Sequence, residues 1–333
     1  MNKSLLCSVI FIVTVIGVAI IRKSFLVKVS AYSIAIITPI SHPSLEKIEQ
    51  GFIETFDKLT RTKNSYKIYN AQGKKPLLRT LAERAINSSY DLIFTIAAGP
   101  SLMTNEIGRK RGSNIPQIFS AVSHPMDYGI VQNRMITGVA EVYNPTLQID
   151  ALRYFKPSAE HVLIVYDPHE TPALQSDAEN VRRILESYLI KTSKLEISNI
   201  LELAQRVAPF LHKIDTILVL IDNTVVAGID VLITLCDRYG ITLVTSDLNS
   251  GLKGASLSTG VKEEMYGIKA AYQANEVLVH HKNILTIPYV FLDDHYVQIN
   301  TEKMSKQNLP AEKKLLSLPK VSQEKGCICV NLS

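Results

Sequence analysis

The sequence predicts an α/β fold of two lobes, each a parallel sheet flanked by helices. Three observations predict it. Short β-branched apolar runs alternate with longer segments in which apolar residues recur every three to four positions. This alternation occurs about four times over residues 32–135 and about four times again over 145–250. The chain has 333 residues, which suits roughly two domains.

The expected strands are short and rich in β-branched residues. Two of them, 91–96 and 216–221, are apolar almost throughout, as expected when helices cover both faces of a parallel sheet. The predicted strands are Tyr32–Thr38, Ser65–Asn70, Asp91–Ile96, Gln117–Val122, Ile136–Val142, His161–Tyr166, Ser193–Ser198, Thr216–Ile221 and Ile241–Thr245.

The expected helices lie between these strands and show the 3.6-residue period of an amphipathic helix. They are Pro43–Leu59, Pro76–Ile86, Leu147–Phe155, Pro172–Leu189, Ile200–Leu211, Val225–Tyr239 and Lys262–His281.

Two extended stretches punctuated by glycine or proline, 135–145 and 254–261, suit crossings between the lobes. We therefore expect a first lobe of residues 31–142 plus 262–285. The second lobe would comprise 143–261 plus 286–312. Residues 313–333, with their Lys, Ser and two Cys, indicate a poorly ordered tail.

The N-terminal 30 residues indicate export. The run Leu5–Ile21 carries no charge and at about 1.5 Å per residue would span about 25 Å as a helix, the short limit for crossing a bilayer. A cleaved signal peptide ending near Ala31 is one interpretation. We favour an uncleaved signal anchor, because Arg22 and Lys23 lie between the run and that cleavage site. Either way the body is expected to be extracytoplasmic, anchored through residues 5–21 or secreted.

The net charge of +5 does not indicate a nucleic-acid partner. Four of the basic residues lie in 1–30, where there is no acid, so the body carries only about +1. The composition, 46% hydrophobic and 20% charged, also excludes a disordered chain.

Polar residues follow many of the predicted strands, and the carboxyl ends of parallel strands meet at one edge, where ligands bind. Hydroxyl and amide side chains there can cap helices, and a helix start suits a carboxylate. An acid on the opposing lobe suits an ammonium group, so a cleft with both suits a zwitterion. The plainer alternative is that each residue only caps its helix. The candidates are Ser41, His42, Gly99, Pro100, Ser101, Ser123, His124, Asp222, Asn223, Thr224, Ser246 and Asp247. Tyr143, in a crossing stretch, is expected to touch a ligand ring.

Catalytic and metal signals are weak. The sequence contains no GxSxG, P-loop, GxGxxG or HExxH motif, so we expect no enzyme and no cofactor. His42, His124, His169 and Asp247 have side chains that can bind a metal ion. A metal site requires three or four such side chains around one point, and we expect no metal. His42 and His124 are either ordinary loop histidines or pH-sensitive ligand contacts.

Several stretches resemble a known family. They are 34–56, YNAQG (69–73), DLIFTIAAGPS (91–101), 115–131, TGVAEVYN (137–144), IDNTVVAGID (221–230), 245–261 and YGIKAA (266–271). In this order they resemble the substrate-binding proteins of ABC transporters of the tryptophan/tyrosine/phenylalanine type, over residues 32–310. The resemblance implies a type I periplasmic-binding-protein-like fold, which would here be preceded by an N-terminal membrane segment.

The resemblance also implies roles for the candidates. Residues 41–42 match the first cleft loop, and 99–101 match a loop that helps to hold a ligand carboxylate. Residues 222–224 match the most recognisable family motif, and 246–247 match a loop whose acid would face a ligand ammonium. His124 departs from the family, which usually has Asp there.

The sequence and the resemblance together predict an extracytoplasmic, membrane-tethered solute-binding component of an ABC importer. It would bind an amino acid or similar small zwitterion between its lobes, close by a hinge, and deliver the ligand to a permease. The alternative is a ligand-sensing module that docks a signalling partner instead of a permease.

Overall fold

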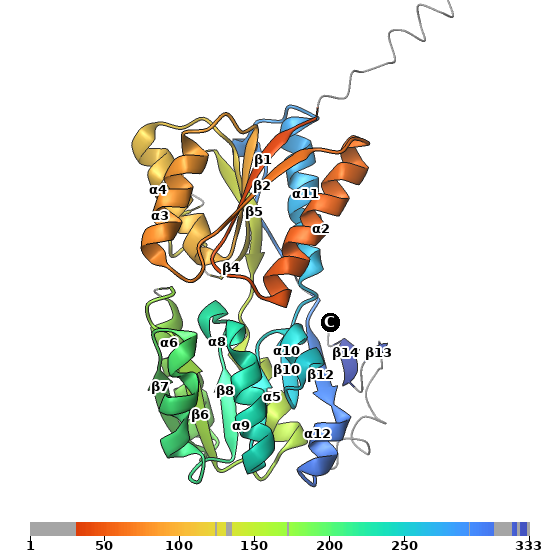
Figure 1. Ribbon diagram of the computed structural model, residues 1–333. Helices are drawn as coiled ribbons and strands as arrows, with labels where there is room; N and C mark the ends of the chain where they lie inside the picture. The colour runs from red at the N-terminus through yellow and green to blue at the C-terminus, as the bar shows by residue number, and fades with distance from the viewer. Residues whose placement is uncertain are drawn as a thin grey trace, which may run out of the picture.

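The computed structural model describes residues 31–123, 125–130, 135–171, 173–292, 294–309, 322–324 and 327–331. Within them the chain forms two α/β units, each built around its own sheet (Figure 1). Both sheets are mostly parallel and flanked by helices, as predicted. The predicted membrane segment lies outside the described residues. None of the helices described has the length and apolar character needed to cross a bilayer.

The first lobe has a sheet in the order β11-β5-β4-β3-β1-β2, and all neighbours are parallel. Helices α2 and α11 lie on one side of it and α3 and α4 on the other (Figure 1). Its strands are β1 (Ser33–Thr38), β2 (Ser65–Asn70), β3 (Leu92–Ile96), β4 (Gln117–Ser123), β5 (Ile136–Glu141) and β11 (Val290–Phe291). Its helices are α2 (Pro43–Thr60), α3 (Lys75–Ile86), α4 (Ala98–Arg111) and α11 (Glu264–Leu278), with a 3₁₀ turn over Ile284–Thr286.

Glycines let α2 and α11 pack closely. A Cβ at Gly267 would lie 2.6 Å from the Phe52 amide nitrogen and overlap the Ile48 carbonyl. A Cβ at Gly51 would lie 2.6 Å from the Glu264 carbonyl. These contacts hold the first turn of α11 against the middle of α2. The starts of both helices belong to the site described below.

The second lobe has a sheet in the order β13-β14-β12-β10-β9-β8-β6-β7. Neighbours from β7 to β10 are parallel, and β12, β14 and β13 pair antiparallel. Its strands are β6 (His161–Tyr166), β7 (Lys191–Glu196), β8 (Thr216–Val219), β9 (Thr242–Thr245), β10 (Leu257–Gly260), β12 (Tyr296–Asn300), β13 (Ser322–Glu324) and β14 (Cys327–Asn331).

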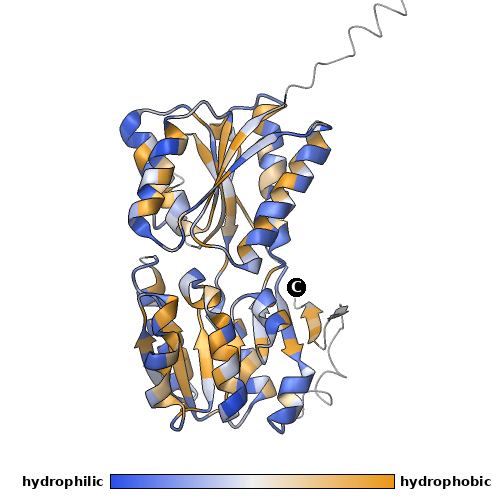
Figure 2. Cartoon of the chain, in the orientation of Figure 1, coloured by the Kyte–Doolittle hydropathy of each residue, from blue (hydrophilic) through white to orange (hydrophobic). Residues whose placement is uncertain are grey.

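The helices of the second lobe bury two separate apolar cores, one on each face of the sheet. They are α5 (Pro145–Phe155), α6 (Ala173–Ser187), α7 (Leu203–Val207), α8 (Asn223–Ala227), α9 (Ile229–Tyr239), α10 (Leu248–Lys253) and α12 (Thr301–Lys306), with 3₁₀ turns over Ile200–Glu202 and Ala208–Phe210. Figure 2 shows the result in both lobes: the strands are largely apolar, and the helices carry both polar and apolar residues.

The structure corrects several boundaries. Residues 98–111 and 248–253, expected to begin as loops, are helices from their first residues. The second lobe was expected to resume at residue 286, but Val290–Phe291 pairs with β5 of the first sheet. The tail was expected to be poorly ordered, yet Cys327–Asn331 pairs with β12 along its whole length. β7 begins two residues before the predicted strand, because its pairing with β6 fixes its register.

The chain passes between the sheets in three segments. They run from β5 to α5, from β10 to α11, and from β11 to β12. The carboxyl ends of the parallel strands in both lobes point to the space between the lobes (Figure 1). Ligand sites of parallel α/β sheets lie at such ends.

Candidate functional site between the lobes

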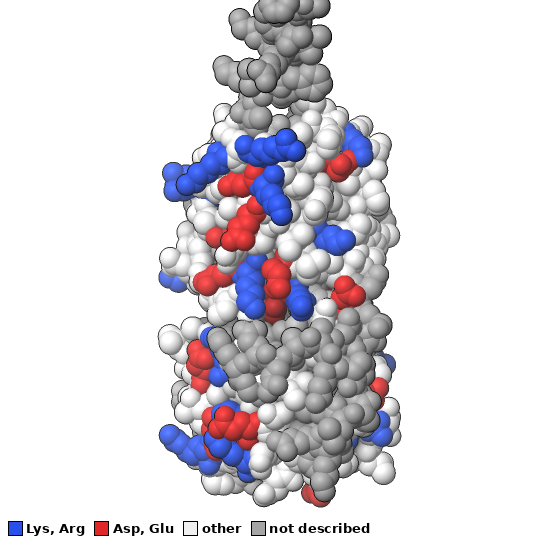
Figure 3. Space-filling model, turned by 90° about the vertical axis from the view of Figure 1, so that its right-hand side faces the viewer, with Lys and Arg blue, Asp and Glu red and all other residues white. Residues whose placement is uncertain are grey.

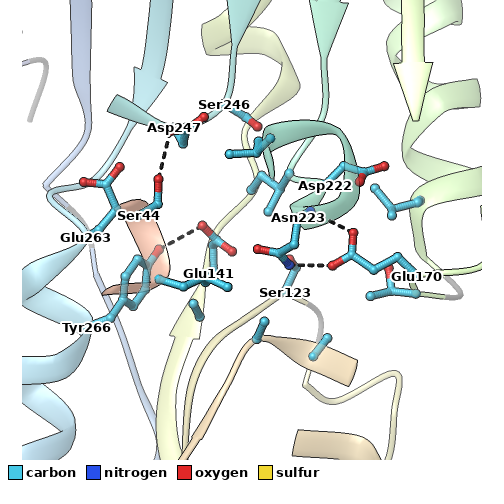
Figure 4. Close-up of a pocket in the computed structure, with 18 of the residues that line it drawn as sticks. Ser44, Ser123, Glu141, Glu170, Asp222, Asn223, Ser246, Asp247, Glu263 and Tyr266 are labelled. Atoms are coloured by element: carbon cyan, nitrogen blue, oxygen red, sulfur yellow. Dashed lines mark hydrogen bonds between the residues drawn. The ribbon is translucent and has the colours of Figure 1, made fainter. Parts of the chain in front are cut away.

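A cavity that is partly open to solvent lies between the two lobes. Its wall contains residues at or just beyond the carboxyl ends of β1, β3, β4 and β5 of the first lobe and of β6, β8, β9 and β10 of the second. Figure 4 shows that its polar side chains come from both lobes and from the segments that connect them.

The wall formed by the first lobe presents the starts of two long helices. α2 begins beside Ser44 and Leu45, and α4 begins at Ala98. No described side chain caps either helix, and the residue before each, His42 or Ala97, supplies no cap. The first N–H groups of these helices therefore have no partner within the helix, and with the helix dipole they favour a negative group.

Two alanines in this wall have positive φ. Ala97 has φ 70° at the start of α4, and Ala121 has φ 51° at a register shift in β4. Both line the cavity. This conformation costs free energy for an L residue, and such strain clusters at ligand sites.

In the wall formed by the second lobe, acidic side chains cap the starts of the helices. Asp222 accepts the Val225 amide at 2.9 Å at the start of α8, and Asp247 accepts the Ser250 amide at 2.9 Å at the start of α10. Glu170 accepts the Asn223 amide at 2.8 Å. The helix starts of this lobe are thus already matched to negative side chains.

Further acids lie at the crossing segments. Glu141 ends β5, and its carboxylate accepts a hydrogen bond from the Tyr266 hydroxyl at 3.2 Å (Figure 4). Glu263 precedes α11 and accepts the Leu248 amide at 3.0 Å. Asp177 of α6 also lines the cavity.

Burial shifts the acids of the cavity toward their neutral forms. It raises the pKa of Glu141 to about 7, opposed by the Tyr266 hydrogen bond. Burial, with the nearby Asp247 charge, raises the pKa of Glu263 to about 8. Burial and neighbouring Glu170 raise the pKa of Asp222 well above its usual range. These directions are expected where carboxylates are desolvated together without cations.

Hydrogen bonds join the lobes across the cavity. The Ser44 hydroxyl donates to the Asp247 carboxylate at 2.9 Å, and His42 Nε2 lies 3.0 Å from Asn223 Oδ1. Burial lowers the pKa of His42, which favours the neutral ring. The lobes are therefore in direct contact in this structure.

The structure brings six of the candidates predicted from the sequence into the wall of one cavity: His42, Ser123, Asp222, Asn223, Ser246 and Asp247. They come from both lobes, as the strand-end argument predicts. His124 lies outside the described residues.

The other candidates lie away from this wall. Exposed Ser41 accepts a hydrogen bond from the Asn70 amide at 2.6 Å. Buried Ser101 bonds within its own lobe, as does Thr224 to Asp167 at 3.0 Å. Tyr143 lines a smaller neighbouring hollow. Gly99 and Pro100 lie within the first turn of α4, and the alanines before them line the cavity instead.

The strand-end argument missed several residues of the wall, and the same signal could have found two of them, Glu141 and Glu170. Glu141 lies next to the last residue of the predicted strand Ile136–Val142, and Glu170 lies four residues beyond the predicted strand His161–Tyr166. Glu263 and Tyr266 follow a predicted crossing. In the part of the chain that the structure describes, no group of three or more His, Cys, Asp or Glu is arranged to hold a metal ion.

The fold and the site define a two-lobed binding protein. The sequence profile of the ABC transporter substrate binding protein family matches residues 33–322, and the chain belongs to this family. This confirms the predicted resemblance. Members of the family bind a substrate without converting it, so the chain is not an enzyme.

Two curated relatives are similar over most of the chain. One is a tyrosine-binding protein of Clostridioides difficile (strain R20291), 26% identical over 274 residues, covering 80% of this chain and 77% of the relative. The other is an uncharacterised protein of Rickettsia prowazekii (strain Madrid E), 24% identical over 289 residues, covering 86% and 88%.

Solved structures share the fold. A domain from Streptococcus pneumoniae in complex with L-Trp has a TM-score of 0.78 at 17% identity, over 86% of this chain and 98% of that one. The ligand-free, open structure of a substrate binding protein from Clostridium difficile has a TM-score of 0.61 at 20% identity, over 89% and 98%.

Proposed function

We propose that the chain is the extracytoplasmic solute-binding component of an ABC importer. It holds an amino acid or similar small zwitterion between its lobes, and closure of a hinge brings both lobes onto the ligand. The observation that carries this proposal is the division of charge in the cavity. One wall presents uncapped helix starts, and the other presents carboxylates.

The first wall suits the carboxylate of the ligand. The N–H groups at the starts of α2 and α4 are donors without helical acceptors, and they act with the dipoles of helices of 18 and 14 residues. The strained Ala97 directs the chain into α4 at this point.

The acids suit the ammonium group, and we place Glu141 first among them. Asp247, which the sequence favours for this role, already accepts hydrogen bonds from the Ser44 hydroxyl and from the amide and hydroxyl of Ser250. Within the described residues, Glu141 accepts only one, from Tyr266. A bound ammonium therefore gains more at Glu141 than at Asp247.

The relatives support the ligand class, since one is a tyrosine-binding protein and one solved neighbour holds L-Trp. The crossing segments after Glu141, before Glu263 and around Leu292 are the places where a hinge between the lobes would bend. The contacts of Ser44 and His42 with the second lobe are of the kind that closure would form.

Thermal unfolding with each of the twenty standard amino acids tests the proposal. A ligand at 100 times its Kd stabilises the folded chain by about 2.7 kcal/mol, so at least one amino acid should raise the unfolding temperature by several degrees. Small-angle scattering with that amino acid should report closure of any open population. A chain that no amino acid stabilises would refute the proposed ligand class.

A further inference from the structure

The cavity is more acidic than a simple zwitterion requires. Among the described residues, six carboxylic acids line it and no Lys or Arg does: Glu141, Glu170, Asp177, Asp222, Asp247 and Glu263. The outside differs, because Figure 3 shows Lys and Arg interleaved with Asp and Glu over the face of the first lobe that it presents. A zwitterion carries one ammonium and one carboxylate, so it leaves most of these carboxyl groups without a cationic partner.

The acids surround the cavity rather than meet at one point. In Figure 4, Asp247 and Glu263 lie on one side and Asp222 and Glu170 on the other, with Glu141 between them. Repulsion from both Asp247 and Glu170 adds to burial in raising the Glu141 pKa, which agrees with this intermediate place. One ammonium group has three N–H donors and cannot serve both sides at once.

Two buried polar atoms in the same wall have no hydrogen-bond partner within the described structure. They are Nδ1 of His42, a side chain that is 6% exposed, and Oγ of Ser246, 9% exposed. Both residues line the cavity, one from each lobe. Buried polar groups are normally paired, so these atoms indicate a ligand that supplies the missing partners.

The hydrogen bonds that link His42 to Asn223 and Glu170 determine whether Nδ1 of His42 is a donor or an acceptor. The Asn223 amide nitrogen donates to Glu170 at 2.5 Å, which leaves the Asn223 oxygen facing His42 Nε2 at 3.0 Å. Nε2 therefore carries the proton, and Nδ1 of the neutral ring presents a lone pair. The wall gains one more acceptor, and the ligand must supply a further donor.

We propose that the ligand of this cavity carries two ammonium groups, as a diamino acid or an aliphatic diamine does. The inference rests on the proposed function, that the cleft binds the ammonium group of an amino acid or similar small zwitterion, and it adds a second ammonium group to the ligand. One ammonium lies toward Asp247 and Glu263 and the other toward Asp222 and Glu170, with Glu141 shared between them. The wall presents more hydrogen-bond acceptors than donors. A ligand with two ammonium groups supplies the donors that these acceptors need.

Calorimetry with the full chain and matched ligands tests this. L-Lysine and L-norleucine share backbone and chain length and differ in the second amine, so lysine should bind at least about tenfold more tightly. Cadaverine, which is lysine without its carboxylate, separates the two sources. Tighter binding of lysine indicates a diamino acid. Tighter binding of cadaverine indicates a diamine and would contradict the carboxylate role proposed for the starts of α2 and α4.

The outcomes separate the two proposals. Norleucine or tyrosine binding as tightly as lysine and cadaverine would overturn the two-ammonium proposal and leave the proposed function standing. Failure of every amino compound in the panel to bind would overturn both.

A variant and a proton count give independent checks. Glu141→Gln keeps an acceptor for Tyr266 and removes the charge, so lysine affinity should fall about tenfold or more, whereas Glu264→Gln, on α11 outside the wall, should not change it. Unchanged affinity in Glu141→Gln would contradict the proposal. In the natural chain, a ligand with two ammonium groups should also drive ionisation of Glu141 and release protons at pH 7, seen as a buffer-dependent binding enthalpy. Binding of lysine without proton release would count against it as well.

Discussion

Replacing Glu263 by Gln should make the chain more stable in alkaline solution and leave it unchanged in acid. Glu263 is 6% exposed and lies near Asp247, and its pKa rises to about 8 from an ordinary value of 4.5. Between these pH values the unfolded chain releases this proton while the folded chain retains it. Stability is therefore lost as pH rises from 4.5 to 8, and Gln lacks that loss.

The magnitude follows from the two pKa values. At 1.36 kcal/mol per pH unit, the loss approaches about 5 kcal/mol above pH 8. Opening of the lobes would hydrate the carboxylate, which makes this figure an upper limit. The Gln oxygen can still accept the Leu248 amide, so the start of α10 remains capped and the variant differs mainly in charge.

Urea unfolding at pH 5, 7 and 9 measures the effect. The variant and the natural chain should have similar midpoints at pH 5, and the midpoint of the variant should be higher by an amount that grows through pH 7 to pH 9. Glu264→Gln supplies the control, because it removes a charge one residue away on a side chain outside the cavity wall. A difference that does not change with pH, or a variant that is less stable at pH 9, would refute the assignment of a buried charge to Glu263.

Two further predictions concern packing and closure. Gly267→Ala should destabilise the first lobe by about 1–3 kcal/mol in thermal unfolding, because its Cβ would overlap the α2 backbone. The control Gly108→Ala should be neutral or slightly stabilising, because its Cβ would meet only the tip of a side chain at close range. Equal stability of the two variants would contradict this account of the α2–α11 contact. Ser44→Ala should weaken ligand binding about tenfold, because it removes the 2.9 Å hydrogen bond to Asp247 across the cleft. The control Ser176→Ala, on an exposed turn of α6, should leave binding unchanged. A calorimetric Kd that is unchanged in Ser44→Ala would show that this bond does not contribute to closure.

The local patterns were sufficient to predict the class of fold. Apolar runs such as 216–221 and amphipathic segments such as 43–59 report their own secondary structure, because burial on one or both faces dictates their composition. The alternation of strand and helix then requires parallel pairing, and both sheets are mostly parallel.

Features that depend on distant partners escaped the prediction. Cys327–Asn331 forms a strand because β12 offers it an unpaired edge, and five residues within a polar tail give little local sign of that. Val290–Phe291 joins the first sheet for the same reason, at the edge of β5. Residues 98–111 contain Gly and Pro near their start, which suggested a loop, yet Pro is compatible with the first turn of a helix.

The residues of the site also fall into those that local sequence patterns predict and those that depend on distant partners. Residues that follow strands directly, such as Asp222 and Asp247, could be predicted because the carboxyl ends of parallel strands share one edge. Glu263 and Tyr266 could not, since they enter the cavity only through the path of a crossing segment and the close contact of α11 with α2.

The position of the acids on the crossing segments ties the charge of the cavity to its proposed hinge. Glu141 and Glu263 lie where the chain passes between the lobes, and in this structure burial raises the pKa of each. An empty closed cleft therefore carries an electrostatic cost that separation of the lobes would relieve by hydrating these groups. The hydrogen bonds of Ser44 and His42 to the second lobe oppose that separation. A positively charged ligand removes the cost only in the closed state, which is the differential interaction that a ligand-driven closure requires.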